Sequence, residues 1–287
     1  MSTMRIAICI LMFSLSWTVC GAQTFTAGGS MGMNYIRYQE PSTNEFGHKL
    51  LLDGGNISLP QLGLWFRLDD PSILRKFISV EASIPIAALT STEFRTKDSN
   101  GTLYTTQTED IRHTETSLTV KAGIVIFDDV RIYALFERYH LQSRRANQLL
   151  GSDSGTFYSV DSSTFDEHVW ASNVGLGLSA EWGLFSATSG ISTMLEFAKP
   201  VSVFVSNTNQ DFGDGVWGQK ASGYTLRGRL ELYNDFSSNF RGILGVSLAH
   251  RHWNGDGQIG DDVFGRPIWP VNDEYVTSVN IGLHYIL

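Results

Sequence analysis

Residues Tyr275–Leu287, with the sequence YVTSVNIGLHYIL, decide the fold class. Every second position from Tyr275 falls on one face of an extended chain, and that face is almost entirely apolar or aromatic. The other face carries Ser278, Asn280 and His284. A period of two predicts a β-strand and excludes an amphipathic helix. Because an apolar strand left as a free sheet edge invites aggregation, we expect this strand to pair with the first strand of a closed membrane barrel.

The same stretch resembles the C-terminal assembly signal of bacterial outer-membrane proteins, in which apolar or aromatic residues alternate back from a terminal aromatic. Tyr285 fits that pattern, and Leu287 stands where the signal usually has Phe. The resemblance implies an integral outer-membrane protein of a Gram-negative bacterium. Its partners would be periplasmic chaperones, the barrel assembly machinery, and the lipid and lipopolysaccharide of the outer membrane.

The composition agrees with a single β-rich domain. The chain has 287 residues, of which 17% are charged and 12% aromatic, and it contains 28 glycines. One barrel accounts for this length. The formal net charge of -8 argues against a nucleic-acid partner, since binding to phosphates needs a basic surface.

The first 22 residues have the pattern of a secretion signal. Arg5 supplies positive charge, residues 6–19 form an apolar run, and small residues reach Ala22. The run is shorter than the roughly 18–20 residues of a membrane-spanning helix. We expect cleavage after Ala22, which leaves residues 23–287 as the barrel. Cys9 and Cys20 both lie in the signal, so the mature chain would contain no thiol and no disulfide.

Segments with a period of two recur ten times in residues 23–287. They are separated by connections that are alternately long and short, and a short connection follows every second segment. If the first strand rises from the periplasm, every short turn is periplasmic and every long loop is extracellular, as in outer-membrane barrels. The expected strands are approximately residues 24–38, 56–68, 76–89, 114–127, 130–140, 169–184, 191–205, 224–236, 240–253 and 275–287.

The pattern therefore predicts an all-β fold, a transmembrane up-and-down antiparallel β-barrel of about ten strands. Twelve strands remain an alternative if residues 103–108, or part of residues 144–167, add to the wall. Several strands exceed the roughly 9–11 residues that cross a bilayer. We therefore expect the wall to project above the membrane.

Charged residues on the faces opposite the apolar ones predict a network inside the barrel. The two signs are nearly balanced, and a barrel of this size has a narrow interior. A lumen filled by ion pairs and a narrow selective channel are both compatible with this pattern, although no surplus of one sign marks an ion-selective pore. The predicted members are Arg67, Glu81, Lys121, Glu137, Glu181, Glu196, Arg227, Arg229, Glu231 and Arg241, with Arg131 expected to join them.

Two motifs could in principle bind metal. His250 and His252 share a strand face, and Asp256, Asp261 and Asp262 follow them, which is a possible metal-ligand set. Residues 254–262 also resemble a calcium loop, but Ile259 takes the place of the required Gly. Alternation places both histidines on the lipid-facing side at the outer rim, which favours contact with lipopolysaccharide headgroups. We expect no metal site and no cofactor.

The size and inferred strand count resemble those of the omptin surface proteases. Their activity needs a pair of Asp residues on one rim and an Asp-x-His on the opposite rim. Asp166 and His168 supply an Asp-x-His, but the adjacent pair Asp128 and Asp129 lies in an expected periplasmic turn. No acidic pair on a facing outer strand completes the acid/base set. The sequence therefore supplies only one of the two residue sets that an omptin active site needs.

Two short elements resemble those of other outer-membrane barrels. Residues 38–41, YQEP, resemble an element at the first outer loop of small proteobacterial barrels. Residues 174–184 are similar to part of the Legionella and chlamydial pore-forming outer-membrane family. We expect a structural or surface-interaction role with acidic extracellular loops that could bind an extracellular ligand. A narrow pore for small solutes and an omptin-like protease are the alternatives, and we do not expect an enzyme.

Overall fold

The structure is a computed structural model. It describes residues 23–43, 49–71, 75–86, 88–98, 103–127, 129–151, 157–161, 165–186, 188–209, 213–219, 222–254 and 272–287. The expected signal at residues 1–22 and most of the proposed calcium loop lie outside the described residues. Within the described residues, no helix is both long and apolar enough to cross a membrane.

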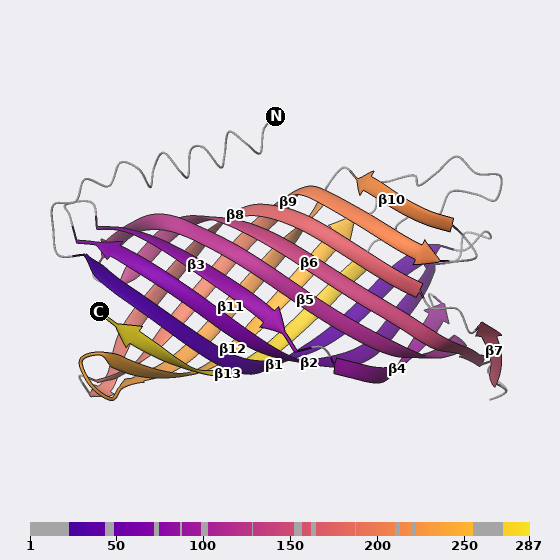
Figure 1. Ribbon diagram of the computed structural model, residues 1–287, viewed down its shortest axis with the longest axis horizontal. Helices are drawn as coiled ribbons and strands as arrows, with labels where there is room; N and C mark the ends of the chain where they lie inside the picture. Colours follow the sequence, from indigo (N-terminus) through magenta and orange to yellow (C-terminus); the bar gives the residue numbers. More distant parts are fainter. Residues whose placement is uncertain are drawn as a thin grey trace.

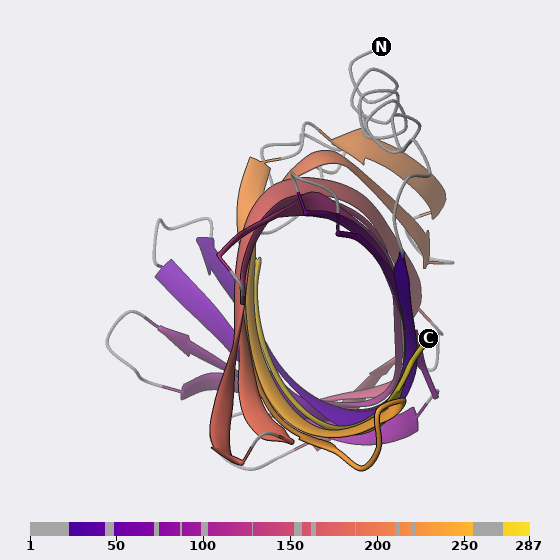
Figure 2. The same ribbon diagram turned by 90° about the vertical axis from the view of Figure 1, so that its left-hand side faces the viewer.

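The described strands form one closed antiparallel barrel with ten strands around its wall, which confirms the predicted fold class and strand count (Figures 1 and 2). The wall consists of β1 (Thr24–Thr43), β2 (Lys49–Asp70), β3 (Lys76–Pro85) continued by β4 (Ala88–Asp98), β5 (Leu103–Phe127), β6 (Val130–Gly151), β8 (Phe165–Ser186), β9 (Ser189–Asn209), β11 (Ser222–Asp235), β12 (Phe240–Asn254) and β13 (Asn272–Ile286). Two further short strands, β7 (Phe157–Asp161) and β10 (Gly213–Gln219), pair with β6 and β9.

The first and last strands close the barrel, as the C-terminal stretch predicts. Their antiparallel register runs from Thr26 opposite Ile286 to Gln39 opposite Asp273. The backbone N–H of Leu287 donates to the carbonyl of Phe25 at 2.8 Å. Closure leaves neither strand as a free edge.

The two ends of the barrel differ. The start of β1 and the end of β13 lie at one end, together with the short connection at residues 236–239 (Figure 1). Strands β4, β7 and β10 lie toward the opposite end. Short turns at the end where β1 starts and β13 finishes are typical of a periplasmic end, so the strands that continue beyond the wall belong to the extracellular end.

The outer half of the chain contains more strand than the sequence predicts. The expected third strand, residues 76–89, is interrupted after Pro85, and its continuation β4 pairs with the same neighbours, β2 and β5. Residues expected to form a polar loop, 90–113, are largely a hairpin of β4 and β5. β1 likewise continues past Pro41, which lies opposite Leu51. Residues 103–108 belong to β5, so these additions leave the wall at ten strands.

The exterior is apolar along most of the wall. Alternate residues of the closing strand, including Ile281 at 64% and Leu283 at 50%, are exposed. Other exposed apolar side chains include Met31, Leu64, Phe66, Leu118, Ile132, Leu176, Leu195, Leu230 and Leu244. This belt is the surface that a bilayer would cover.

Candidate functional site

The interior of the barrel is the candidate site, and an apolar cluster crosses it toward the outer end. Tyr139 on β6 and Trp253 on β12 lie with their ring centroids 6.3 Å apart. Three strands separate β6 from β12 in the sheet order, so this contact crosses the lumen. Leu141, Val169, Ala171 and Val203 complete the cluster. We call this group of six residues the plug.

A second apolar cluster lies inside the barrel near the plug, on the other side of the wall. Ile36, Ile57, Leu59 and Val276 are all buried, with exposures of 6% or less. The sequence pattern predicts that apolar side chains face the lipid. That prediction is wrong for these four residues, which face the interior. The outward-facing neighbours of the two clusters include polar residues: Arg37 follows Ile36, and Arg138 and His140 flank Tyr139. At this level the interior packs like the core of a soluble protein.

Beneath the plug, Arg251 of β12 holds a layer of buried charge together. Its guanidinium donates to Glu115 at 2.5 Å and to Glu274 at 3.2 Å. It also lies 4.5 Å from the centroid of the Tyr139 ring. Glu115 belongs to β5, so this ion pair also spans the lumen.

The next layer contains a continuous chain of ion pairs. Arg227 donates to Glu137 at 2.7 Å and to Glu196 at 2.8 Å. Lys121 contacts both Glu196 and Glu81 at 2.7 Å. Glu137 and Glu196 are each 2% exposed. A buried carboxylate needs paired charge of this kind to offset its lost hydration.

Polar neighbours complete the environment of the two buried carboxylates. The hydroxyl of Tyr133 donates to Glu196 at 2.9 Å, and the amide of Asn173 donates to Glu137 at 2.8 Å. Gly177 lies directly beside the Tyr133 ring, where a Cβ would contact the ring carbons. Glycine at this position leaves the ring room to reach Glu196.

Near the periplasmic end, Glu181 is the centre of a third layer. Arg131 donates to it at 2.9 Å and Arg241 at 3.2 Å, while the guanidinium of Arg67 lies 3.8 Å away. These cations come from β6, β12 and β2, so one carboxylate links three separate strands of the wall. Arg241 also donates to Asp235 at 2.7 Å.

Arg229 and Glu231, consecutive inward residues of β11, are more loosely held. The guanidinium of Arg229 lies 3.6 Å from Glu81 and 3.8 Å from Glu231. Both distances exceed the range of a charge-assisted hydrogen bond, about 2.7–2.9 Å. The two side chains therefore have close electrostatic partners without the hydrogen bonds that Arg227 makes.

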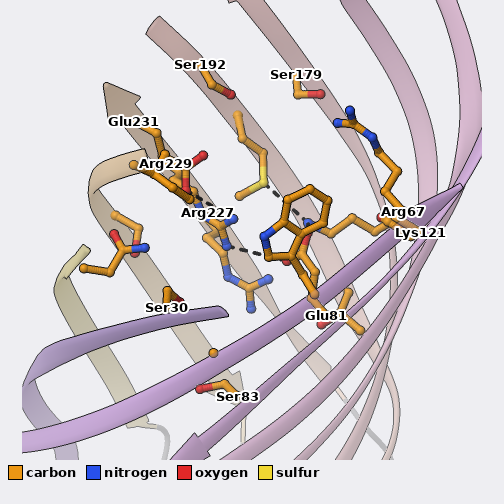
Figure 3. A pocket seen from close by; sticks show the side chains of 18 of the residues that line it. Ser30, Arg67, Glu81, Ser83, Lys121, Ser179, Ser192, Arg227, Arg229 and Glu231 are labelled. Atoms are coloured by element: carbon orange, nitrogen blue, oxygen red, sulfur yellow. Dashed lines mark hydrogen bonds and ion pairs between the residues drawn. The ribbon is translucent and has the colours of Figure 1, made fainter. Parts of the chain in front are cut away.

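These side chains surround a cavity of about 360 Å³ in the lumen (Figure 3). Its lining reaches from Thr24 and Ile286 at the periplasmic end to Glu115 and Arg251 below the plug. Hydroxyl and amide side chains form much of the remaining lining. They include Ser30, Asn34, Gln61, Ser83, Ser247 and Asn280.

The structure places all ten predicted network residues in the interior, and Arg131 lies with them. Sequence reasoning missed Glu115 and Glu274 and left Arg251 out of the network. Glu115 shares the parity of Lys121, so alternation could have identified it, whereas Glu274 precedes the start of the expected last strand. Adjacent Glu137 and Arg138 made the faces of β6 hard to assign, and the structure turns Glu137 inward and Arg138 outward.

The two histidines of the possible metal set lie on the exterior near the outer end. His250 and His252 both contact the same carboxylate oxygen of Asp273, at 2.7 and 2.8 Å. Tyr275 stacks on His250, with ring centroids 4.5 Å apart. In the part of the chain that the structure describes, no group of three or more metal-ligating side chains is suited to hold an ion. The expected ligands Asp256, Asp261 and Asp262 lie outside the described residues.

The Asp-x-His of β8 is also turned to the exterior. His168 stacks against His140 and Trp170, with ring centroids 5.5 and 5.3 Å away. The residue between, Glu167, shares the parity of inward-facing Val169. Asp166 lies 3.9 Å from the exposed Arg144. Asp129 is at the periplasmic end, and Asp128 lies outside the described residues.

Comparisons with known proteins identify the fold. No protein-family model matches the chain, and no curated protein matches its sequence. The structure is similar to the outer membrane protease OmpT from Escherichia coli, with a TM-score of 0.64 and 11% identity over 92% of this chain and 97% of that one. Weaker matches include the translocator domain of the Neisseria meningitidis autotransporter NalP (TM-score 0.38, 7% identity, 99% and 95% coverage) and Ail of Yersinia pestis (0.31, 11%, 92% and 99%). The chain has the fold of a bacterial outer-membrane β-barrel.

Proposed function

We propose that this protein is a sealed outer-membrane barrel with a structural or surface-interaction role. In this proposal, function resides in the strands that project from the outer end, and transport through the lumen is not its activity. The observation that carries the proposal is the set of contacts across the interior. The plug, the Arg251 layer and the Arg227 layer each join strands that are not neighbours in the sheet.

The sealed lumen is the reason to prefer this role over a narrow pore. Tyr139 is 2% exposed and Trp253 is 7% exposed, although both point into the lumen. An aqueous pore would leave such inward side chains accessible. Barrels that conduct freely have about 16–18 strands, and a wall of ten strands leaves an interior that side chains can fill.

The outer hairpins supply the surface for interaction. β4 with β5, β6 with β7, and β9 with β10 continue beyond the barrel wall, and β10 leans outward from it (Figures 1 and 2). These segments and connections carry charges of both signs with acidic residues in excess, for example Glu109, Asp110 and Asp214, although β6 contributes Arg144 and Arg145. An extracellular ligand or partner would meet this surface first, and a basic one would be favoured by charge.

The lipid-facing rim supports a contact with the outer leaflet. His250, His252 and Tyr275 form an aromatic and imidazole surface just above the apolar belt, and His140 with Trp170 forms another. Amphipathic rings of this kind are placed at membrane interfaces. We infer that these surfaces contact lipopolysaccharide headgroups.

The omptin-like protease is the weaker alternative despite the similarity in fold. A protease of that type needs its acid/base groups to face one another across a cleft. Asp166 and His168 point away from the interior, and the described outer strands bring no acidic pair to them. We therefore propose that the chain has no proteolytic activity of this type.

Planar-bilayer recording tests the sealed barrel. Purified barrel, shown to be folded by heat-modifiable migration on gels, is expected to add no discrete conductance steps to the bilayer. Regular steps of constant size from the folded fraction would contradict the proposal and favour the pore.

A separate assay addresses the protease. The barrel reconstituted with lipopolysaccharide is incubated with a library of basic peptides, and no cleavage is expected. If cleavage occurs and is lost in the variants Asp166→Ala and His168→Ala, the proposal that the chain is not a protease is wrong.

A further inference from the structure

We propose that the lumen cavity is a binding site for a small zwitterionic solute that enters from the periplasm. Arg229 and Glu231 would recognise its carboxylate and ammonium groups. This inference goes beyond the proposed function, which assigns no ligand to the interior. It requires the cavity and the plug, and it does not depend on the outer hairpins.

Arg229 and Glu231 differ from the other charged residues of the lumen. Arg227 makes hydrogen bonds of 2.7 and 2.8 Å and its side chain is 16% exposed. Arg229 has ion-pair distances of 3.6 and 3.8 Å, and its side chain is 31% exposed toward the cavity. The nearest cation to the Glu231 carboxylate is this same Arg229, at 3.8 Å. Among the described residues, no hydrogen bond uses the full capacity of either group.

The two side chains offer complementary chemistry within one site. A guanidinium binds a carboxylate through two parallel N–H donors, and a carboxylate accepts hydrogen bonds from an ammonium. A solute that carries both groups on adjacent carbons could satisfy Arg229 and Glu231 together. A simple anion could bind only to Arg229, and a simple cation could bind only to Glu231, so neither would use both side chains.

The opposite wall of the cavity suits the rest of such a ligand. Ser30 on β1 and Ser83 on β3 line the same cavity as Arg229 and Glu231 (Figure 3). Hydroxyl groups can donate or accept, so they tolerate a small polar side chain. The volume of about 360 Å³ lies within the range of ligand pockets, about 300–1,000 Å³.

The direction of entry follows from the layers of the lumen. Thr24 and Ile286 at the periplasmic end belong to the lining, whereas the plug closes the outer end. The layer around Glu181 lies on the route, and its members keep side-chain exposures of 14–23%. The site is therefore reached from the periplasm.

The test uses the full mature chain, folded in detergent, and L-alanine as the zwitterionic probe. Ligand-observed NMR measures binding of L-alanine, with acetate and methylammonium as probes that carry one charge each. We expect saturable binding of L-alanine and much weaker binding of the other two. Arg229→Gln and Glu231→Gln should each weaken L-alanine binding at least about tenfold.

Arg138→Gln is the matched control, because this exposed arginine points outward from β6, and its binding should equal that of the wild type. If Arg229→Gln does not fold, Arg229→Lys replaces it and should also weaken binding, because lysine lacks the fork of donors. The proposal is overturned if the folded wild type does not bind L-alanine. It is also overturned if acetate binds as tightly, or if the cavity variants bind like the control.

Discussion

Arg227 and Glu137 join across the interior of the barrel, with 2.7 Å between the guanidinium nitrogen and the carboxylate oxygen. Arg227 comes from β11 and Glu137 from β6, and β8 and β9 lie between them in the sheet. The bond therefore links parts of the wall that share no backbone hydrogen bonds. Several such links connect opposite parts of the wall, and loss of one partner would leave a buried charge unpaired.

Removal of one partner from this buried pair should destabilise the barrel strongly. Glu137→Ala leaves Arg227 with Glu196 as its only hydrogen-bonded carboxylate and opens a void beside Asn173. We expect a loss of about 3–5 kcal/mol in the free energy of unfolding, measured by urea titration in lipid vesicles. The neighbouring change Arg138→Ala removes an exposed outward side chain with one hydrogen bond, to Ser172 at 2.7 Å, and should cost no more than about 1 kcal/mol. Equal losses in the two variants would contradict the structure.

Two glycines of β8 provide a matched test of interior packing. A Cβ at Gly177 would collide with the ring of Tyr133, whereas a Cβ at Gly183 would meet no atom within 4 Å. Gly177→Ala should lower the free energy of unfolding by about 1–3 kcal/mol because the ring must move away from Glu196. Gly183→Ala should be nearly neutral. A neutral Gly177→Ala would show that the Tyr133 ring is not held as described.

Truncation of the plug should make the barrel conduct. Trp253→Ala removes the ring that meets Tyr139 across the lumen, so small ions should pass the outer end. The expected result is discrete conductance in planar bilayers that the wild type lacks. Tyr275→Ala, which removes an exterior aromatic ring that stacks on His250, should give no conductance steps. Conductance in both variants would point to general disruption.

An engineered disulfide tests the closure of the barrel. The hydroxyl of Ser278 donates to the side-chain carbonyl of Asn34 at 2.6 Å, and the two residues are opposite one another on β13 and β1. Residues 23–287 contain no cysteine, so in the double variant Asn34→Cys and Ser278→Cys no other thiol can compete for the disulfide. We expect oxidation to join the two strands and to raise the temperature at which the folded gel band is lost. Asn34→Cys with Thr277→Cys should not cross-link, because Thr277 points to the other face.

Alternation in the sequence predicts most of the wall and the inward face of each strand. It does so because lipid imposes an apolar outer face wherever a strand crosses the bilayer. Nearer the outer end that constraint is weaker, and β5 shows the consequence: residues 103–113 are mostly polar on both faces, so their strand structure was not predicted. The burial of Ile36 and Leu59 inside the barrel was not predicted for the same reason.

The contacts across the lumen could not be predicted either. Which residues meet depends on the register of ten strands and on which of them face one another, and that information is not local. The pattern places Glu137 and Arg227 inside, but they are 90 positions apart in the sequence and nothing local indicates that they bond. Arg229 and Glu231 likewise share a face in the sequence, and only the structure shows that their ion-pair distances to described residues are as long as 3.6 and 3.8 Å.

Cysteine accessibility in whole cells tests the sealed barrel most directly. Ser83 lines the cavity below the plug, and residues 23–287 contain no competing thiol. In Ser83→Cys, a charged thiol reagent that cannot cross membranes should fail to label the protein from outside the cell. After the reagent is admitted to the periplasm, labelling should proceed, and Trp253→Ala should restore labelling from outside. Equal labelling of Ser83→Cys from both sides, with the plug intact, would contradict the sealed lumen.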